Sequence, residues 1–286
     1  MAEGRSDTFK GALWMGGSLL SLAAMAIGGR ELAGDLTTFQ IMFWRSLVSL
    51  TLISLALTHS GWGQVRTASF KVHAIRSVTH FGAQFCWFFA IAVIPLVEVF
   101  ALEFTSPIWL AAMAAIFLGE RLTPARILAV VLGFVGVLVI LQPGMSAIGL
   151  GSLAALGSAI GYAATHVTTR LLAQRDTALC VLFYMTAIQM PLGLAAALTD
   201  WRWPAVETWP WIVLVGLASM SAHYTLTRAM SLIEATVAGP MGFLRLPLIA
   251  AVGYLFYGEA LEIAVIIGAL LICSGIFLNL RDAERR

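Results

Sequence analysis

Three charged residues lie inside long apolar stretches of the chain, where a charge needs a partner, water or a ligand. They are Arg45, Glu103 and Arg245. On insertion scales, such a residue at the centre of a membrane-spanning helix costs about 2.5–3.5 kcal/mol, so it is usually paired or functional. Arg45 and Glu103 are at nearly the same depth, roughly 12 Å at about 1.5 Å per residue, which allows an ion pair. The pair would act as a gate or substrate clamp, with Glu103 able to take a proton, or as a static support.

Arg245 lies near the middle of its apolar stretch and has no carboxylate at equal depth, although Glu103 is within reach across a cavity. A guanidinium in this position predicts that Arg245 binds an anionic group of a substrate through two parallel hydrogen bonds. The alternative is that Arg245 caps backbone carbonyls freed by Pro240 and Pro247. Prolines on either side favour the substrate interpretation, because broken helices at the midplane are where transporters bind their substrates.

Further aromatic and polar side chains inside apolar stretches predict a cavity that stacks on an organic molecule and hydrogen-bonds to it. Any one of them alone is better explained by packing or by the membrane interface. The predicted substrate-binding residues, besides Arg245, are Gln84, His223, His80, Tyr162, His166, Tyr184, Trp109 and Trp14, and Trp87 lies near them in the chain. Tyr162 and His166 are four residues apart and share a helix face.

Several classes of enzyme are excluded. The chain has only two lysines, Lys10 and Lys71, and neither follows a glycine, so a phosphate-binding loop that ends in Gly-Lys is impossible. All five aspartates are expected in loops or termini, which argues against an intramembrane aspartyl protease. The three cysteines lie in apolar runs and are interpreted as small packing residues.

Composition leaves a serine–histidine membrane hydrolase open, but no serine lies in a nucleophile-elbow pattern. A membrane scaffold or receptor is a further alternative, although it would need neither midplane charges nor prolines beside Arg245. We expect no catalytic residues, no metal site and no cofactor.

The composition indicates a membrane protein. Of 286 residues, 60% are hydrophobic and 11% are charged, against about 25% charged in soluble domains. The net charge of +2 gives no indication of nucleic-acid binding. A spanning helix needs about 20 mostly apolar residues. Ten stretches meet this criterion: 11–28, 37–58, 74–94, 96–118, 124–141, 149–171, 177–198, 209–229, 235–257 and 261–280.

The chain contains an internal repeat. A shift of 139 positions aligns residues 81–141 with 220–280 without a gap, including Gly119-Glu120 with Gly258-Glu259. We expect a cytoplasmic N-terminus (1–10), two five-helix repeats (11–141 and 149–280) and a cytoplasmic C-terminus (281–286). Thirteen Lys and Arg residues then lie on the inner side and two on the outer side, which supports this orientation. Because five is odd, the two repeats must be inverted, as in alternating-access transporters.

The sequence resembles the drug/metabolite transporter superfamily, in particular its ten-helix branch built from two EamA domains. The resemblance covers nearly the whole chain, is stronger in the first half and rests on short segments. These are Phe43-Trp44-Arg45-Ser46, Ala90 to Pro95 with Glu98, Ser106-Pro107, Gly119-Glu120-Arg121 and Gly133-x-x-Gly136-Val137. In the second half, Pro240 and Pro247 replace the single Ser106-Pro107 break. The resemblance implies an all-α bundle of ten transmembrane helices around a central cavity.

We therefore expect a secondary transporter of a small organic metabolite, multi-pass in the bacterial inner (plasma) membrane. Export of amino acids or related zwitterions is favoured on the resemblance. Uptake of an aromatic vitamin- or nucleoside-like metabolite, such as riboflavin or S-adenosylmethionine, is the alternative, and multidrug export is the third. The expected partners are the substrate, the lipid bilayer and protons, with no nucleic acid. One chain is sufficient because it contains both repeats.

Overall fold

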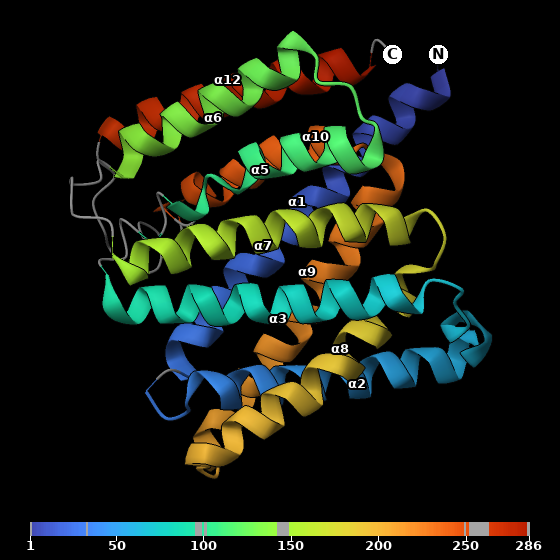
Figure 1. Ribbon diagram of the computed structural model, residues 1–286, viewed down its shortest axis with the longest axis vertical. Helices are drawn as coiled ribbons and strands as arrows, with labels where there is room; N and C mark the ends of the chain where they lie inside the picture. The colour runs from blue at the N-terminus through green and yellow to red at the C-terminus, as the bar shows by residue number, and fades with distance from the viewer. Residues whose placement is uncertain are drawn as a thin grey trace. The chain divides into compact units, whose positions relative to one another are not determined.

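The computed structural model describes residues 2–32, 34–94, 99, 102–141, 149–248, 250–251 and 263–284. Within these ranges every predicted span contains helix (Figure 1). The long helices are α1 (Ala2–Leu32), α2 (Thr38–Ser60), α3 (Phe70–Val93), α6 (Pro124–Leu141), α7 (Leu150–Ala173), α8 (Ala178–Ala197), α9 (Trp209–Leu232) and α12 (Ile263–Glu284). Pro95, Glu98 and Gly258-Glu259, on which the repeat and the resemblance partly rest, lie outside the described residues.

Side-chain caps set where two of these helices begin. Thr37 precedes α2 and accepts from the backbone N–H of Gln40, while the Gln40 side chain accepts from the backbone N–H of Thr37. This reciprocal arrangement is a capping box, which satisfies two amides that lack intrahelical partners. Thr177 caps α8 by accepting from the backbone N–H of Cys180 at 3.2 Å. Both helices therefore begin at threonines that follow short turns.

The fourth and ninth predicted spans are not uniform α-helices. The fourth contains α5 (Ser106–Met113), which continues as the π-helical segment η2 (Ala114–Leu118) and ends at Gly119. Gly119 has φ +67°, a left-handed conformation that glycine adopts at little cost. The ninth contains α10 (Ala235–Met241), followed by the 3-10 turn η5 (Gly242–Leu244). The expected interruption near Pro240 is therefore present, directly before Arg245.

Four helices in the described part of the chain are long and apolar enough to cross a membrane: Asp7–Gly29, Thr38–Ser60, Ala178–Asp200 and Ile263–Glu284. Two apolar helices, Ser106–Leu118 and Pro124–Ile140, are shorter. Helices α3, α7 and α9 have 24 residues each. These three are long enough, but the polar side chains inside them lower their hydropathy.

The chain divides into two compact units, and each unit takes segments from both sequence repeats. The first contains residues 1–13, 82–167 and 229–286, and the second contains residues 14–81 and 168–228. Helices α1, α3, α7 and α9 therefore contribute to both units. A repeat of the sequence is thus not a unit of packing, since helices of one repeat pack on helices of the other.

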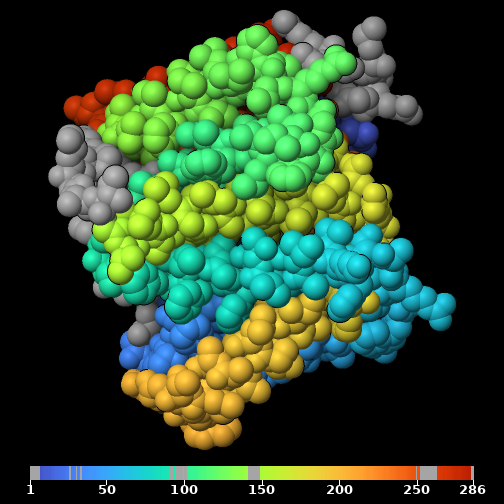
Figure 2. All heavy atoms as spheres, viewed as in Figure 1, coloured from blue at the N-terminus to red at the C-terminus, as the bar shows by residue number. Residues whose placement is uncertain are grey.

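In the first unit, α6 packs along α12 (Figures 1 and 2). A shift of 139 residues carries α6 onto α12, so the two are counterparts. A Cβ atom on Gly136 would lie 2.7 Å from the carbonyl oxygen of Gly268, and one on Gly275 would lie 3.1 Å from that of Ala129. Glycine permits this approach of backbones. The same shift relates Gly136 to Gly275 and Ala129 to Gly268, so the contact is reciprocal and the helices are antiparallel.

In the second unit, α2 packs along α8, and these helices are also counterparts. A Cβ atom on Gly193 would lie 3.2 Å from the backbone of Phe43, while Ile53 and Leu57 pack on Leu182, which again makes the pair antiparallel. Trp44 contacts the rings of Trp201 and Trp209 near one end of α2. The buried core at this end contains Leu32, Leu36, Phe43, Trp44, Ile212 and Val215.

Candidate functional site

The charged centre of the first unit is an ion pair between Arg245 and Glu103. The Arg245 guanidinium donates through Nη2 to Oε1 of Glu103, and the side chains are 24% and 8% exposed. Arg245 follows the turn η5, and Glu103 precedes the start of α5 at Ser106. Glu103, which the sequence places within reach of Arg245, is thus its partner in the structure, and a substrate-binding role for Arg245 stays a prediction.

Two irregularities near this pair depart from the regular α-helical rise used to estimate depth from the sequence. The chain before Arg245 passes through a 3-10 turn, which rises about 2.0 Å per residue. Phe104 and Thr105 form a turn between Glu103 and α5. Each irregularity moves a side chain away from the position that a regular helix would give it.

Aromatic side chains cover both members of the pair. The Trp87 indole donates to Oε2 of Glu103 at 2.8 Å. The Arg245 guanidinium lies over the Phe104 ring, 5.1 Å from its centre, and Phe104 stacks on Phe243 at 6.2 Å. Cation–π contacts of this kind contribute about 0.5–2 kcal/mol, depending on desolvation. The pair is therefore a compensated charge centre enclosed by aromatic surface.

One nitrogen of the Arg245 guanidinium is not used in the described contacts. The Nε atom of Arg245 is buried and has no hydrogen-bond partner among the described residues. Tyr162 of α7 is near enough to Arg245 to interact with it electrostatically. Of the other residues predicted here, Trp109 is 38% exposed and donates to Thr105 Oγ1 at 3.2 Å, while His166 is half-buried and Gln84 is buried. Arg245, Glu103 and Tyr162 thus come together, with Trp87 and Phe104 as additions.

The second unit contains a buried polar network around Gln189 of α8, which is 1% exposed. Arg45 donates to Gln189 Oε1 at 3.0 Å and to Ser219 Oγ at 3.4 Å. The Gln189 amide nitrogen is 3.1 Å from the Ser77 carbonyl and 2.9 Å from Nδ1 of His80. Because an amide N–H donates, Nδ1 of His80 accepts, which assigns the proton of neutral His80 to Nε2.

His223 continues this network, since its ring meets that of His80 edge to face at 5.0 Å. The structure therefore brings together Arg45, His80 and His223, all predicted, with Gln189, which the sequence analysis missed. Gln189 could have been recognised as a candidate from the sequence, because it is an amide side chain in the middle of the seventh predicted span. A pair between Arg45 and Glu103 would join the two units, so it stays a prediction.

Arg76 of α3 is a buried cation of the second unit. In the sequence it was one of the thirteen basic residues expected on the inner side of the membrane. Its side chain is 1% exposed. Its Nε donates to Thr169 Oγ1 at 2.7 Å, but Nη1 and Nη2 have no hydrogen-bond partner among the described residues. Burying a charge without an opposite charge is costly. Arg76 is therefore a candidate for holding an anionic group.

Two predicted aromatic residues of the second unit have local partners. The Tyr184 hydroxyl donates to the carbonyl of Val65 at 3.0 Å, and its ring lies against His73, so it anchors the turn η1 (Trp62–Val65). Trp14 meets Tyr224 edge to face at 6.1 Å, and Arg228 lies over its ring at 5.7 Å. For both residues these contacts favour packing over direct substrate contact.

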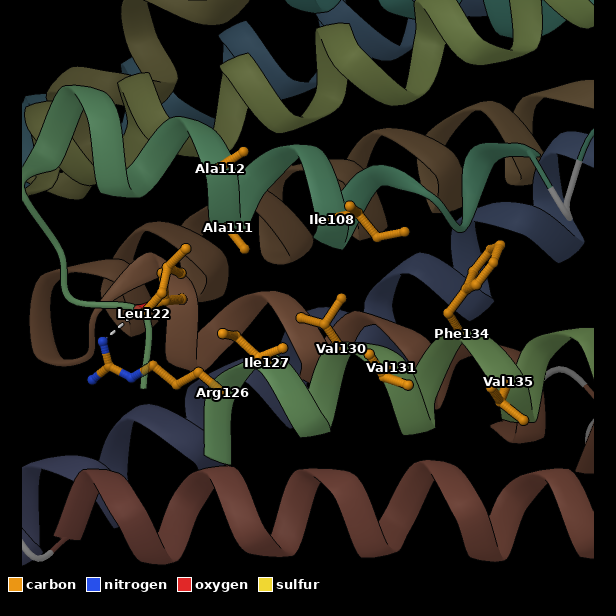
Figure 3. Close-up of a pocket in the computed structure, with 11 residues that line it drawn as sticks. Ile108, Ala111, Ala112, Leu122, Arg126, Ile127, Val130, Val131, Phe134 and Val135 are labelled. Atoms are coloured by element: carbon orange, nitrogen blue, oxygen red, sulfur yellow. Dashed lines mark hydrogen bonds between the residues drawn. The ribbon is translucent and has the colours of Figure 1, made fainter. Parts of the chain in front are cut away.

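A groove between α5 and α6 has a volume of about 370 Å³ and an almost entirely apolar lining. In Figure 3, Ile108, Ile127 and Val130 extend toward the groove, and Arg126 lies at one end. Arg126 is already occupied, since it donates to Thr236 Oγ1 at 2.7 Å and forms an ion pair with Glu234. The groove offers little hydrogen bonding and therefore suits hydrocarbon better than a polar metabolite.

Glu120 follows the fourth predicted span of the first repeat, and it caps the beginning of α10. Its carboxylate accepts from the backbone N–H groups of Ala235 and Thr236, each at 2.9 Å, and from the Thr236 hydroxyl at 2.8 Å. A carboxylate at a helix N-terminus is stabilised by the amides and the helix dipole. Glu120 is thus a helix cap supplied by a segment distant in the sequence.

The described residues form helices and no strand, and apolar helices enclose charged and aromatic groups, an arrangement typical of multi-pass membrane proteins. The chain belongs to the EamA-like transporter family, whose model matches residues 9–142 and 149–281. This identification confirms the resemblance to drug/metabolite transporters.

Curated relatives transport different metabolites. A riboflavin transporter of Rhizobium johnstonii is 30% identical over 280 residues, 96% of this chain and 92% of the relative. An S-adenosylmethionine uptake transporter of Rickettsia bellii is 22% identical and covers 91% of this chain and 89% of its own. A pseudopaline exporter of Pseudomonas aeruginosa is 28% identical and covers 85% and 86%. The relatives therefore include importers and exporters.

A solved crystal structure with 22% sequence identity superposes with a TM-score of 0.83 and covers 98% of each chain. At this identity the likeness concerns the fold alone. It supports the arrangement of the described helices.

Proposed function

We propose that the protein is a secondary active transporter of a small organic metabolite in the inner membrane, with both termini cytoplasmic. Ten spans would form two inverted five-helix repeats around a central cavity and open it to each side in turn. The antiparallel packing of the counterpart helices α6 and α12, and of α2 and α8, supports this arrangement. The polar residues buried inside α3, α7 and α9 explain why these helices are less apolar than typical spans.

The substrate that fits best is a metabolite with an aromatic ring and a polar or zwitterionic group. The carrying observation is the Arg245–Glu103 pair, enclosed by Trp87 and Phe104. Trp87 and Phe104 offer faces for stacking, and the free Nε–H of Arg245 offers a donor. Uptake of an aromatic vitamin- or nucleoside-like metabolite is favoured, because the curated relatives include transporters named for riboflavin and S-adenosylmethionine.

Export of amino acids or related zwitterions is the second candidate, and a specific observation supports it. Arg245 and Glu103 present opposite charges side by side, so they can exchange their mutual contact for a substrate carboxylate and ammonium. The exporter among the relatives agrees with this direction. Multidrug export is third, because the aromatic surface alone would suffice for it.

A ligand screen separates these candidates. The protein is purified in detergent, and its melting temperature is measured with flavins, nucleosides, S-adenosylmethionine, amino acids and polyamines. A ligand at one hundred times its dissociation constant stabilises by about 2.7 kcal/mol, which is readily detected. Stabilisation by a flavin or nucleoside supports the first proposal, and stabilisation by aliphatic amino acids alone supports the second.

The binding site is then tested with Arg245→Gln, with Arg202→Gln as the matched control. Arg202 is an exposed arginine whose guanidinium pairs with Asp200 in a connection. We expect Arg245→Gln to weaken binding of the best ligand by about tenfold or more, since one charge-assisted contact contributes about 1.5–3 kcal/mol. Equal binding by both variants would overturn the assignment of this site, and flux of the hit into proteoliposomes then gives its direction.

A further inference from the structure

Three side chains that could bind a metal ion converge in the second unit. His73 is in the first turn of α3, Asp176 is in the turn between α7 and α8, and Cys180 is in the first turn of α8. One ligand atom from each residue lies within 4.8 Å of the others. From the sequence, Cys180 was expected to be a packing residue and the aspartates to lie in loops or termini. The convergence of Cys180 and Asp176 with His73 was not predicted.

The distances are close to those of a coordination shell. His73 Nε2 is 3.0 Å from Asp176 Oδ2 and 3.9 Å from Cys180 Sγ. In a tetrahedral zinc site, bonds of about 2.0–2.3 Å place neighbouring ligand atoms roughly 3.3–3.7 Å apart. The two separations from His73 Nε2 are therefore within a few tenths of an ångström of those in a zinc site, and the third ligand-atom pair, Asp176 with Cys180, lies within 4.8 Å.

The surroundings fix the ligands in place. Thr67 donates to Asp176 Oδ2 at 2.9 Å, and the Tyr184 ring lies 4.7 Å from that of His73. Thr177 caps α8 and so fixes the turn that carries Cys180. Interactions of this kind orient ligands and strengthen metal sites. His73 and Cys180 are buried, the Asp176 side chain is 8% exposed, and Thr67 is half-buried, so the three ligands are largely shielded from solvent.

The chemistry of the three ligands selects a class of ion. A thiolate and an imidazole together favour zinc and similar borderline-soft divalent ions over Mg²⁺ or Ca²⁺, which prefer oxygen. Three protein ligands leave a fourth position for water or the Thr67 hydroxyl. We propose that His73, Asp176 and Cys180 bind a divalent ion of the Zn²⁺ class. The ion would tie the start of α3 to α8 and to the turn that precedes it.

The test uses Co²⁺ as a spectroscopic substitute for Zn²⁺. The full chain is purified in detergent, stripped with a chelator and titrated with Co²⁺, because a thiolate bound to Co²⁺ gives an intense near-ultraviolet absorption band. The background variant Cys86→Ser/Cys273→Ser leaves Cys180 as the chain's one cysteine. We expect one equivalent of Co²⁺ to produce the band, and Zn²⁺ to abolish it by displacement.

Removing single ligands then tests the assignment. In the background variant, Cys180→Ser should abolish the band, while His73→Gln and Asp176→Asn should each weaken Co²⁺ binding by about tenfold or more. Melting curves and gel filtration without metal establish that each variant is folded. The proposal is overturned if the folded background protein shows no thiolate band with Co²⁺, or if the band survives Cys180→Ser. Neither result depends on the identity of the transported substrate.

Discussion

Arg245 donates to one carboxylate oxygen of Glu103 while the Trp87 indole donates to the other. Each charge therefore depends on the other, and neutralising one leaves the other without its counterion. Glu103→Gln should lower the free energy of unfolding by about 2 kcal/mol or more, which a fall in the melting temperature would reveal. The double variant Glu103→Gln/Arg245→Gln should be more stable than Glu103→Gln alone. Additive losses in a double-mutant cycle would contradict a direct pair.

Glu103 is also the acidic group best placed to couple protons to transport. A proton on Glu103 would cancel its charge, loosen Arg245 and free the guanidinium for a substrate. Flux of the identified ligand into proteoliposomes should therefore respond to an imposed pH gradient, and in Glu103→Gln the response should disappear. If wild-type flux ignores the gradient, proton coupling is wrong and the substrate gradient drives transport.

The contact between α6 and α12 leaves no room for side chains. Because a Cβ on Gly136 would lie 2.7 Å from the Gly268 carbonyl oxygen, Gly136→Ala should destabilise by about 1–3 kcal/mol. Gly157→Ala is the matched control, since a Cβ there meets nothing within 4 Å. The control should be neutral or stabilising by up to about 1 kcal/mol. Melting curves in detergent measure both, and equal stability would contradict the packing described.

The cap on α10 predicts a second stability effect. Glu120→Gln removes a charge that accepts from the amides of Ala235 and Thr236, so we expect a loss of about 1 kcal/mol. The control is Glu207→Gln, which alters an exposed carboxylate in η4 (Val206–Thr208). Thermal unfolding should separate the two variants by several degrees. Indistinguishable curves would show that the cap contributes nothing.

Arg76 should show opposite effects on stability and on function. Arg76→Met removes a buried guanidinium whose terminal nitrogens have no partner among the described residues, so the ligand-free protein should become more stable. The same change should weaken binding of an anionic ligand by about tenfold, and that of a neutral ligand much less. A destabilised Arg76→Met protein would mean that Arg76 stabilises the fold through contacts other than that to Thr169.

The positions of the helices could be predicted from the sequence, because a long apolar run in a membrane satisfies its backbone hydrogen bonds by forming a helix. The irregular turns were partly predictable, since Pro240 marked the interruption before Arg245 and Gly119 marked the end of η2. The π-helical segment had no recognisable pattern. Helix ends also differed, since α1 and α3 begin several residues before the predicted spans.

Contacts between distant helices were the part that the sequence could not specify. Gln189 and His80 are 109 positions apart, and His73 and Asp176 are 103 positions apart. Which helix faces which depends on packing, and neither depth nor periodicity contains that information. Arg45 and His223 are buried, as their positions inside apolar stretches indicated. The sequence suggested Glu103 as the partner of Arg45, but the contacts of Arg45 with Gln189 and of His223 with His80 were not predicted.

The reciprocal contact of α6 and α12 has a consequence for the origin of the chain. Gly136 meets Gly268 as Gly275 meets Ala129, which is the self-complementary pattern of a two-fold homodimer. Two separate half-length chains inserted in opposite directions would make the same interface. Such an ancestor would need nearly balanced basic loops, because one sequence would have to enter the membrane both ways. Fusion into one polypeptide removes that requirement and leaves each half free to evolve its own charge bias.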